Sequence, residues 1–392
     1  MNADELDALS RWIDFRRLSF VSFKKLICLE DIFYQQQLSI RSGMVEMVKT
    51  NTTLRAVAAY ASKAAVVFLV STYVLSMLMG LFLMFLSPEG NGFSKKSIGG
   101  LPIGLLAIFV IRVPVASTFG VVFMVLWIVY AVCFVLAWAI NGGFVRALQR
   151  NTLQYPTAPT GNLLFSFPAL SSSLLMLIVL IQGFQEAAGL PTGQISVRPI
   201  YRELFELTYS PIFEEVMFRL SPYAVYAAAR LGLLFATKRS EDLRFYPKSL
   251  ILSVLFPDRA KEALGLSSIR LNGIRRSVNI WEWILLILTS MIFGLAHYLS
   301  GSGWEMGKVT VSFLAGLAFF IAYLAFGFHA PILLHWFFNY YFDVYEIASK
   351  TYQGLFQSVE TAIGLVVQIV GLAVILVYVI YLPKRICDKF SQ

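Results

Sequence analysis

Apolar runs long enough to cross a membrane recur along this chain, and they constrain its fold more than any other feature. A helix needs about 20 apolar residues to span a bilayer, and helix is the default there because unpaired backbone groups in lipid are costly. Only 14% of the 392 residues are charged and 58% are hydrophobic, whereas a soluble domain carries about 25% charged residues. The sequence therefore predicts an all-α, polytopic membrane bundle of about eight transmembrane helices.

The apolar runs divide the chain into a surface segment and a membrane domain. We expect residues 1–60 to form a basic, amphipathic surface segment and residues 61–392 to form a single membrane domain. The expected spans are 62–86, 117–140, 165–184, 207–233, 279–299, 307–327, 329–346 and 361–382. The run Leu101–Ile111 is too short for a span, and we expect it to be interfacial or re-entrant. The basic connection 234–278 is expected to lie on the lipid headgroups.

The positive charge of the chain indicates its orientation in the membrane. The formal net charge is +9, and the basic residues lie between the apolar runs, where anionic headgroups attract Lys and Arg. They concentrate before the first span, in the connection 234–278 and after the last span. With eight spans these segments share one side, which the positive-inside rule makes cytoplasmic, together with both termini. The pattern indicates membrane lipids, and not nucleic acid, as the partner of this charge.

Ionisable side chains inside a span are costly and are therefore candidate functional groups. Glu215 and Arg219 are four residues apart, so they share a helix face and can form an ion pair. Glu214 lies about 100° further around the helix and cannot easily use the same partner. A buried carboxylate of this kind can act as a general base. The alternative is a structural salt bridge that holds this helix in the bundle.

Two of the three histidines, His297 and His335, lie at mid-span positions and face other polar or aromatic groups. His297 follows Phe293 by one helical turn, so Phe293 can hold the imidazole in a water-poor pocket. His335 and Asn339 are also one turn apart, and an imidazole beside a carboxamide can donate hydrogen bonds to a developing oxyanion. Because three separate spans bring hydrolytic groups into lipid, one shared cavity is the more economical interpretation.

These motifs, in this order, resemble the CaaX protease and bacteriocin-processing family, which includes the Ras-converting prenyl-protein endopeptidase. The matching patterns are E-E-x-x-x-R, F-x-x-x-H and H-x-x-x-N, and the resemblance covers about residues 205–345, within the catalytic-like helices at 205–346. It implies a helical bundle around a conical intramembrane cavity and an endopeptidase that acts on a prenylated C-terminus or a small peptide precursor. The implied roles are a Glu214 base assisted by His297, an oxyanion site of His335 and Asn339, and bracing by Glu215 and Arg219.

The resemblance implies a glutamate-type mechanism without a metal or other cofactor. A zinc set of Glu214, His297 and His335 is the alternative, but H-E-x-x-H is absent and an Asn beside His335 suits an oxyanion hole better. Cys28, Cys133 and Cys387 have neither metal-binding spacing nor a disulfide framework.

Two other functions use the same residues. A proton-coupled transporter would place Glu214 and His297 on a proton path, but it predicts internal repeats, and we find none. A non-catalytic scaffold or immunity protein would tolerate loss of Glu214. For the peptidase, the expected spans place Glu214 roughly 9 Å outward of mid-membrane, whereas prenylated C-termini arrive from the cytoplasm. Three explanations of this mismatch are open: the span boundaries are shifted by a few residues, the orientation is inverted, or the substrate is extracytoplasmic.

Overall fold

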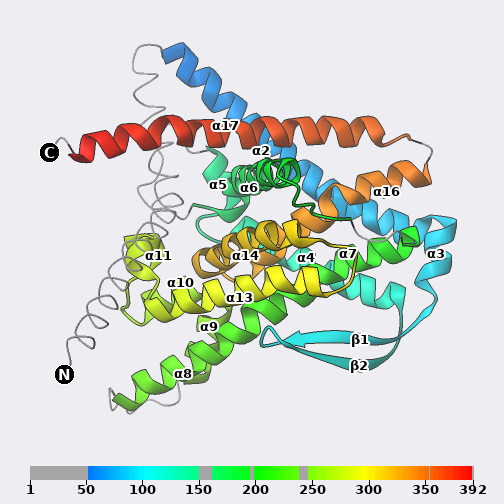
Figure 1. Cartoon of the computed structure of the whole chain (residues 1–392), viewed down its shortest axis with the longest axis horizontal. Coiled ribbons are helices and arrows are strands. Elements are labelled where there is room, and N and C mark those ends of the chain that lie inside the picture. The colour runs from blue at the N-terminus through cyan, green and yellow to red at the C-terminus, as the bar shows by residue number, and fades with distance from the viewer. Residues whose placement is uncertain (1–51, 150–160, 195–197, 238–245, 353, 391–392) are drawn as a thin grey trace, which may run out of the picture.

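The computed structural model describes residues 52–149, 161–194, 198–237, 246–352 and 354–390. These residues are almost entirely helical and contain one two-stranded antiparallel sheet (Figure 1). Residues 1–51, most of the expected N-terminal surface segment, lie outside the described ranges. In chain order the elements are α2 (Thr52–Leu81), η1 (Phe82–Leu86), α3 (Pro88–Ser94), β1 (Ser97–Leu105), β2 (Phe109–Thr118), α4 (Phe119–Ala139), α5 (Phe144–Gln149), α6 (Leu163–Ala187), α7 (Ile200–Glu215), η2 (Val216–Leu220), α8 (Ser221–Thr237), α9 (Tyr246–Leu255), α10 (Pro257–Ala263), α11 (Ile269–Asn272), α12 (Ile274–Ser277), α13 (Ile280–Leu299), α14 (Met306–Phe326), α15 (His329–Trp336), η4 (Phe337–Tyr341), α16 (Asp343–Thr351) and α17 (Gln357–Phe390).

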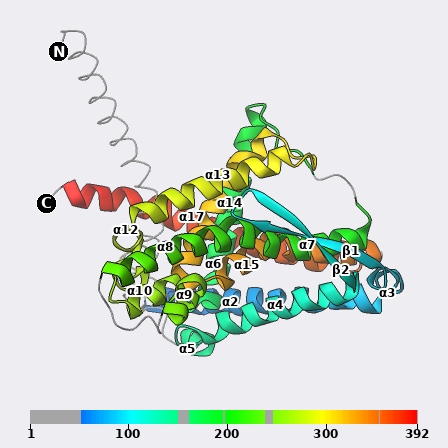
Figure 2. The same cartoon turned by 90° about the horizontal axis from the view of Figure 1, so that it is seen from below.

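Six helices in the described part of the chain are long and apolar enough to cross a membrane, which makes this an integral, multi-pass membrane protein. Each matches an expected span to within a few residues. Figure 2 shows α13 inclined relative to α2 and α4. The six are Ala59–Leu86, Phe119–Ala139, Leu163–Ala187, Ile280–Leu299, Met306–Phe326 and Gln357–Val377.

The other two expected spans, 207–233 and 329–346, are helical but are not among these six, so the count of about eight is not confirmed. The first forms α7, η2 and α8, and the second forms α15, η4 and α16. Each contains a π-helical segment, which inserts an extra residue into a turn and is frequent at functional sites. Every residue of α15 is buried, and α15 packs against α4, α6, α7 and α14. This helix therefore lies inside the bundle.

The helix that carries the two glutamates starts earlier than expected. It begins at Ile200, seven residues before the predicted start of the span at 207. The Tyr201 hydroxyl and the Ser87 Oγ lie 2.8 Å apart, which places the start of α7 beside the end of the first span. Glu214 follows Tyr201 by 13 residues, so it lies about 20 Å further along the helix axis.

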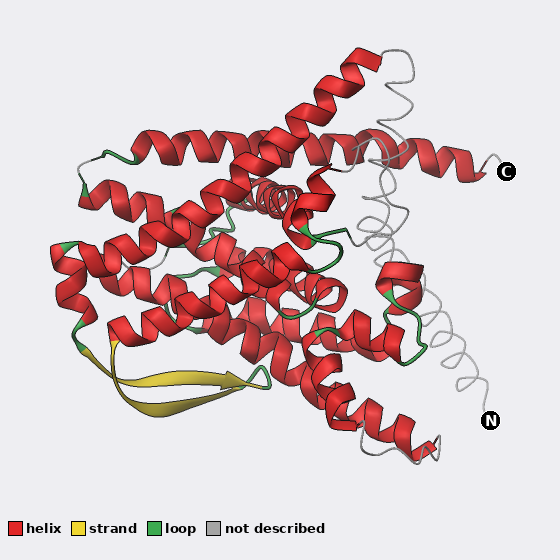
Figure 3. Ribbon diagram, turned by 180° about the vertical axis from the view of Figure 1, so that it is seen from behind, coloured by secondary structure: helices red, strands yellow, loops and turns green. Residues whose placement is uncertain are grey.

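The apolar run Leu101–Ile111, expected to be interfacial or re-entrant, belongs to a β-hairpin, the one departure from the all-α class in the described residues (Figure 3). Glycine and proline, which disfavour helix, recur in this segment, and Pro102 pairs with Arg112 across the strands. Three residues, Leu106–Ile108, connect the paired Leu105 and Phe109. Leu106 and Ala107 both have positive φ, and the Ile108 amide donates to the Leu105 carbonyl to close the turn.

Two hydrogen bonds attach the hairpin turn to η2 and α8. The Ala107 amide donates to the Met217 carbonyl at 2.9 Å, and the Leu106 amide donates to the Ser221 Oγ at 2.8 Å. Positive φ is unfavourable for residues with a side chain, and such strain persists where the surroundings hold it. The hairpin turn is therefore held by the helix that follows the two glutamates.

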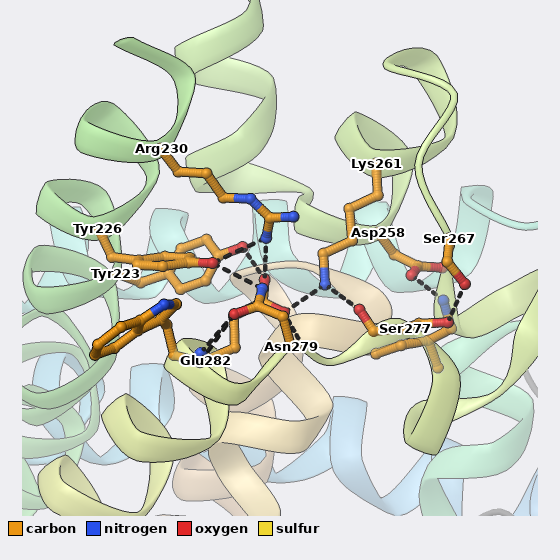
Figure 4. Close-up of polar contacts among 11 residues, drawn as sticks. Tyr223, Tyr226, Arg230, Asp258, Lys261, Ser267, Ser277, Asn279 and Glu282 are labelled. Carbon is orange, nitrogen blue, oxygen red and sulfur yellow. Dashed lines mark hydrogen bonds and ion pairs between the residues drawn. The ribbon is translucent and has the colours of Figure 1, made fainter. Parts of the chain in front are cut away.

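The helices of the connection 234–278 pack onto the bundle, and its expected position on the lipid headgroups stays a prediction. Helix α9 packs against α8, and α10 packs against α14. Lys261, in α10, is buried, and its Nζ lies 2.7 Å from the Glu282 Oε2 at the start of α13 (Figure 4). The positive charge of Lys261 therefore has a carboxylate partner within the protein.

Gly104 permits the close approach of the hairpin to η2. A Cβ at this position would lie 2.6 Å from both the Cβ and the Sδ of Met217, and overpacking of this kind costs roughly 1–3 kcal/mol. We expect Gly104→Ala to lower the apparent melting temperature in detergent. The control is Gly183→Ala, because a Cβ on Gly183 would meet no atom within 4 Å. Equal melting temperatures for the two variants would contradict the tight contact.

Candidate active site

The two glutamates have different environments because they are adjacent on one helix. Consecutive helical residues point about 100° apart. The Glu215 side chain is fully buried, whereas 19% of the Glu214 side chain is exposed. Both stand at the end of α7, immediately before η2. Glu215 thus faces the interior, and Glu214 has access to a partly open space.

The predicted ion pair between Glu215 and Arg219 is present and fully buried. Arg219 Nη1 donates to Glu215 Oε1 at 3.0 Å. The guanidinium carbon lies 4.2 Å from the Phe293 ring centroid and 5.5 Å from that of Phe319, so the planar cation packs against two aromatic faces. Burial of a charge is tolerated when the charge is paired in this way.

His335 joins this pair to Glu214. Its Nδ1 lies 2.8 Å from Glu215 Oε1, and its Nε2 lies 3.5 Å from Glu214 Oε2. The ring is buried between Phe319 and Phe293, at centroid distances of 5.1 and 5.8 Å. One imidazole therefore contacts both carboxylates, from a helix that lies about 120 residues away in the sequence.

His297 is held by the residue one turn before it, as expected. Its Nδ1 lies 2.9 Å from the Phe293 carbonyl oxygen, and the two rings meet edge to face at 4.7 Å. Because a carbonyl only accepts hydrogen bonds, Nδ1 carries the proton and the neutral ring leaves Nε2 free to accept one. His297 also lies within electrostatic reach of Glu214 and His335.

Asn339 reaches the glutamate helix through a serine. Asn339 lies in η4, and its Nδ2 donates to the Ser210 Oγ at 3.1 Å. Ser210 precedes Glu214 by one turn and so lies on the same face of α7. The amide therefore faces the side of α7 that carries Glu214.

Sequence reasoning missed two groups near this set. Ser210 is one, and Lys308 in the first turn of α14 is the other. The Lys308 Nζ lies 3.9 Å above the Trp304 ring, within electrostatic reach of Glu214 and His297. A lysine near the start of a span is normally interpreted as interfacial, so only the packing of α13 on α14 indicates its proximity to the site.

No group of three or more His, Cys, Asp and Glu residues in the described ranges is arranged to hold a metal ion. In the proposed zinc set, both nitrogens of His335 face carboxylates, and His297 Nδ1 faces a backbone carbonyl. The zinc alternative therefore rests on the residue types of Glu214, His297 and His335, and not on their arrangement.

The buried pair predicts a large loss of stability when its cation is removed. Arg219→Leu leaves Glu215 with only His335 as a partner, and breaking a buried pair costs about 3–5 kcal/mol. The matched control is Arg202→Leu, since Arg202 and Glu206 form an exposed pair at the same spacing in α7, and such pairs contribute about 0–1 kcal/mol. Unfolding in denaturant measures both. Similar losses in the two variants would show that the 215–219 pair is not a major support.

Comparison with known proteins gives one match. Residues 198–341 match the family model described as type II CAAX prenyl endopeptidase Rce1-like. A search of curated proteins and of solved structures gave no match. The matched segment contains Glu214, Glu215, Arg219, His297, His335 and Asn339. The match confirms the resemblance derived from the three motifs: residues 198–341 of this chain are similar to the Rce1-like CAAX prenyl endopeptidases.

Proposed function

We propose that this protein is a glutamate-type intramembrane endopeptidase. The observation that carries the proposal is the contact of one buried imidazole, His335, with two carboxylates from another helix. Glu214 Oε2 is buried and has no hydrogen-bond partner in the described residues, so it can accept a proton from a water molecule. The neighbouring Phe293 and Phe319 rings exclude bulk water, which strengthens electrostatic interactions.

In the proposed reaction, Glu214 removes a proton from water while the oxygen bonds to the scissile carbonyl carbon. His297 assists through Nε2, the ring nitrogen that its Phe293 contact leaves free. The negative oxygen of the tetrahedral intermediate accepts a hydrogen bond from Asn339 Nδ2. His335 donates a second one when both of its ring nitrogens carry a proton. The C–N bond then breaks, and protonated Glu214 passes its proton to the leaving amine.

Glu215 and Arg219 are positioning residues in this scheme. Their pair fixes Nδ1 of His335, so that Nε2 faces Glu214. The substrate is a prenylated CaaX-type C-terminus or a small peptide precursor, and its lipid environment is the bilayer around the bundle.

The depth of Glu214 supports access from the side of the termini. Glu214 lies about 20 Å from the level at which the first span ends, and the hydrocarbon layer is about 30 Å thick. It is therefore nearer the side where that span begins, which the positive-inside rule makes cytoplasmic. Of the three explanations for the depth of Glu214, we favour a shifted span boundary.

Glu214→Gln should abolish cleavage of a farnesylated CaaX peptide in proteoliposomes, by at least about a thousandfold, because the general base is lost. The control Glu186→Gln makes the same change on an exposed residue of α6 and should leave cleavage unchanged. Cleavage of unprenylated peptides, measured in parallel, tests the substrate class. Cleavage in the presence of a chelator tests the metal dependence. Cleavage that survives Glu214→Gln would remove the base assignment and favour the scaffold or transporter functions.

Asn339→Ala should lower kcat by about 10²–10³ with a small change in KM, because an oxyanion donor acts in the transition state. Ser210→Ala retains the amide but removes its 3.1 Å partner, so we expect a smaller loss of roughly tenfold. Steady-state kinetics of the two variants distinguish these outcomes. An unchanged kcat in Asn339→Ala would exclude Asn339 from the oxyanion site.

A further inference from the structure

The β-hairpin lies against the helix that carries the two glutamates. Gly104 approaches Met217 closely, and the Tyr209 hydroxyl donates to the Pro102 carbonyl. Gly100, Pro102 and Gly104 alternate along β1, so they lie on the same face of the hairpin. This face is the one turned toward α7 and η2.

Arg112 belongs to the same face, on the second strand. It pairs directly with Pro102, and residues directly opposite each other share a face. Its side chain folds over Gly100, where an added Cβ would lie 3.3 Å from the Arg112 Nε. Arg112 is nevertheless exposed, and its guanidinium has no ion pair or side-chain hydrogen bond with the described residues. It therefore carries an unpaired cation on the face turned toward the site helix.

The position of this cation along the membrane is unusual. Arg112 pairs with Pro102, whose carbonyl accepts the Tyr209 hydroxyl. Tyr209 follows Tyr201 by eight residues, which is about 12 Å along α7. Tyr201 marks the level at which the first span ends. The neighbouring side chains of Val110, Ile111 and Val113 are apolar and exposed, as expected for a surface in lipid. A lone charge at this depth is costly and is a functional hypothesis by default.

The spacing between Arg112 and the catalytic base fits a short peptide. Glu214 follows Tyr209 by five residues, about 7.5 Å along the helix. The Arg112 Nε lies over Gly100, which is two strand residues, or about 7 Å, beyond Pro102 on the side away from Glu214. The total offset is therefore about 14 Å, which about four to five extended residues span. A peptide entering from the side nearer Glu214 would carry its C-terminus deeper, toward the level of Arg112. A terminal carboxylate at that depth needs a cation.

We propose that Arg112 binds the C-terminal carboxylate of the peptide substrate and so determines where the peptide is cut. The inference rests on the proposed peptidase function, because it takes Glu214 as the position of the scissile bond. A guanidinium matches a carboxylate with two parallel hydrogen bonds. The hairpin holds this group at a set distance from Glu214 through its contacts with Met217 and Ser221.

The test measures binding in the Glu214→Gln protein, so that it does not depend on cleavage. Fluorescent farnesylated CaaX peptides, ending in a free acid or in an amide, are titrated into lipid nanodiscs that contain the protein. We expect the acid to bind roughly ten- to a hundredfold more tightly than the amide, the range for a hydrogen-bonded charge. Adding Arg112→Gln should abolish this difference, and Arg112→Lys should retain part of it.

The control is Arg146→Gln, which removes one exposed positive charge from α5 and should leave the preference for the acid intact. An acid preference that persists in Arg112→Gln would overturn the proposal, as would its absence from the parent protein. An equal loss of affinity for both peptides in Arg112→Gln would also overturn it, because Arg112 would then support binding without recognising the terminal carboxylate. If the preference depends on Arg112 but the chain with Glu214 intact cleaves nothing, the carboxylate site stands and the peptidase function fails.

Discussion

The contact between Glu215, Arg219 and His335 is the interaction on which the site depends. Two opposite charges and an imidazole are buried together, and each would be costly to bury alone. Their mutual hydrogen bonds set the direction of both ring nitrogens of His335. Because Arg219 also packs on Phe293, the same cation links η2 to α13, the helix that carries His297. The polar groups of three helices are thus aligned through one guanidinium.

The two π-helical segments at the site, η2 and η4, have a common consequence. One follows Glu214 and Glu215, and the other contains Asn339. An extra residue in a turn rotates the following side chains and leaves backbone groups without their usual partners. The Met217 carbonyl in η2 accepts a hydrogen bond from the Ala107 amide in the hairpin turn. This hydrogen bond gives a partner to one backbone group of the irregular helix and one of the strained turn. The irregular backbone of the site is buried in protein, as lipid requires.

The sequence predicts the part of this structure that follows from local pattern. Six apolar spans and the spacing of Glu215 with Arg219 need only composition and helical periodicity. The hairpin was missed because a short apolar run such as Leu101–Ile111 is compatible with several structures until its neighbours are known. Ser210 and Lys308 were missed because their relation to Glu214 depends on partners distant in sequence. The burial of Lys261 could not be predicted for the same reason, since its carboxylate partner Glu282 lies in another helix.

Glu282, in the first turn of α13, influences the orientation of His297 in the last turn of the same helix. Its side chain closes a capping box with Asn279 and binds Lys261, so the rotational setting of α13 is locked where the helix starts. A helix of 20 residues transmits such a setting over about 30 Å. A slip of a single residue would swing His297 by about 100°, away from Glu214. His297 follows Glu282 by 15 residues, so the alignment of the imidazole is set by a carboxylate about 22 Å away along the helix axis.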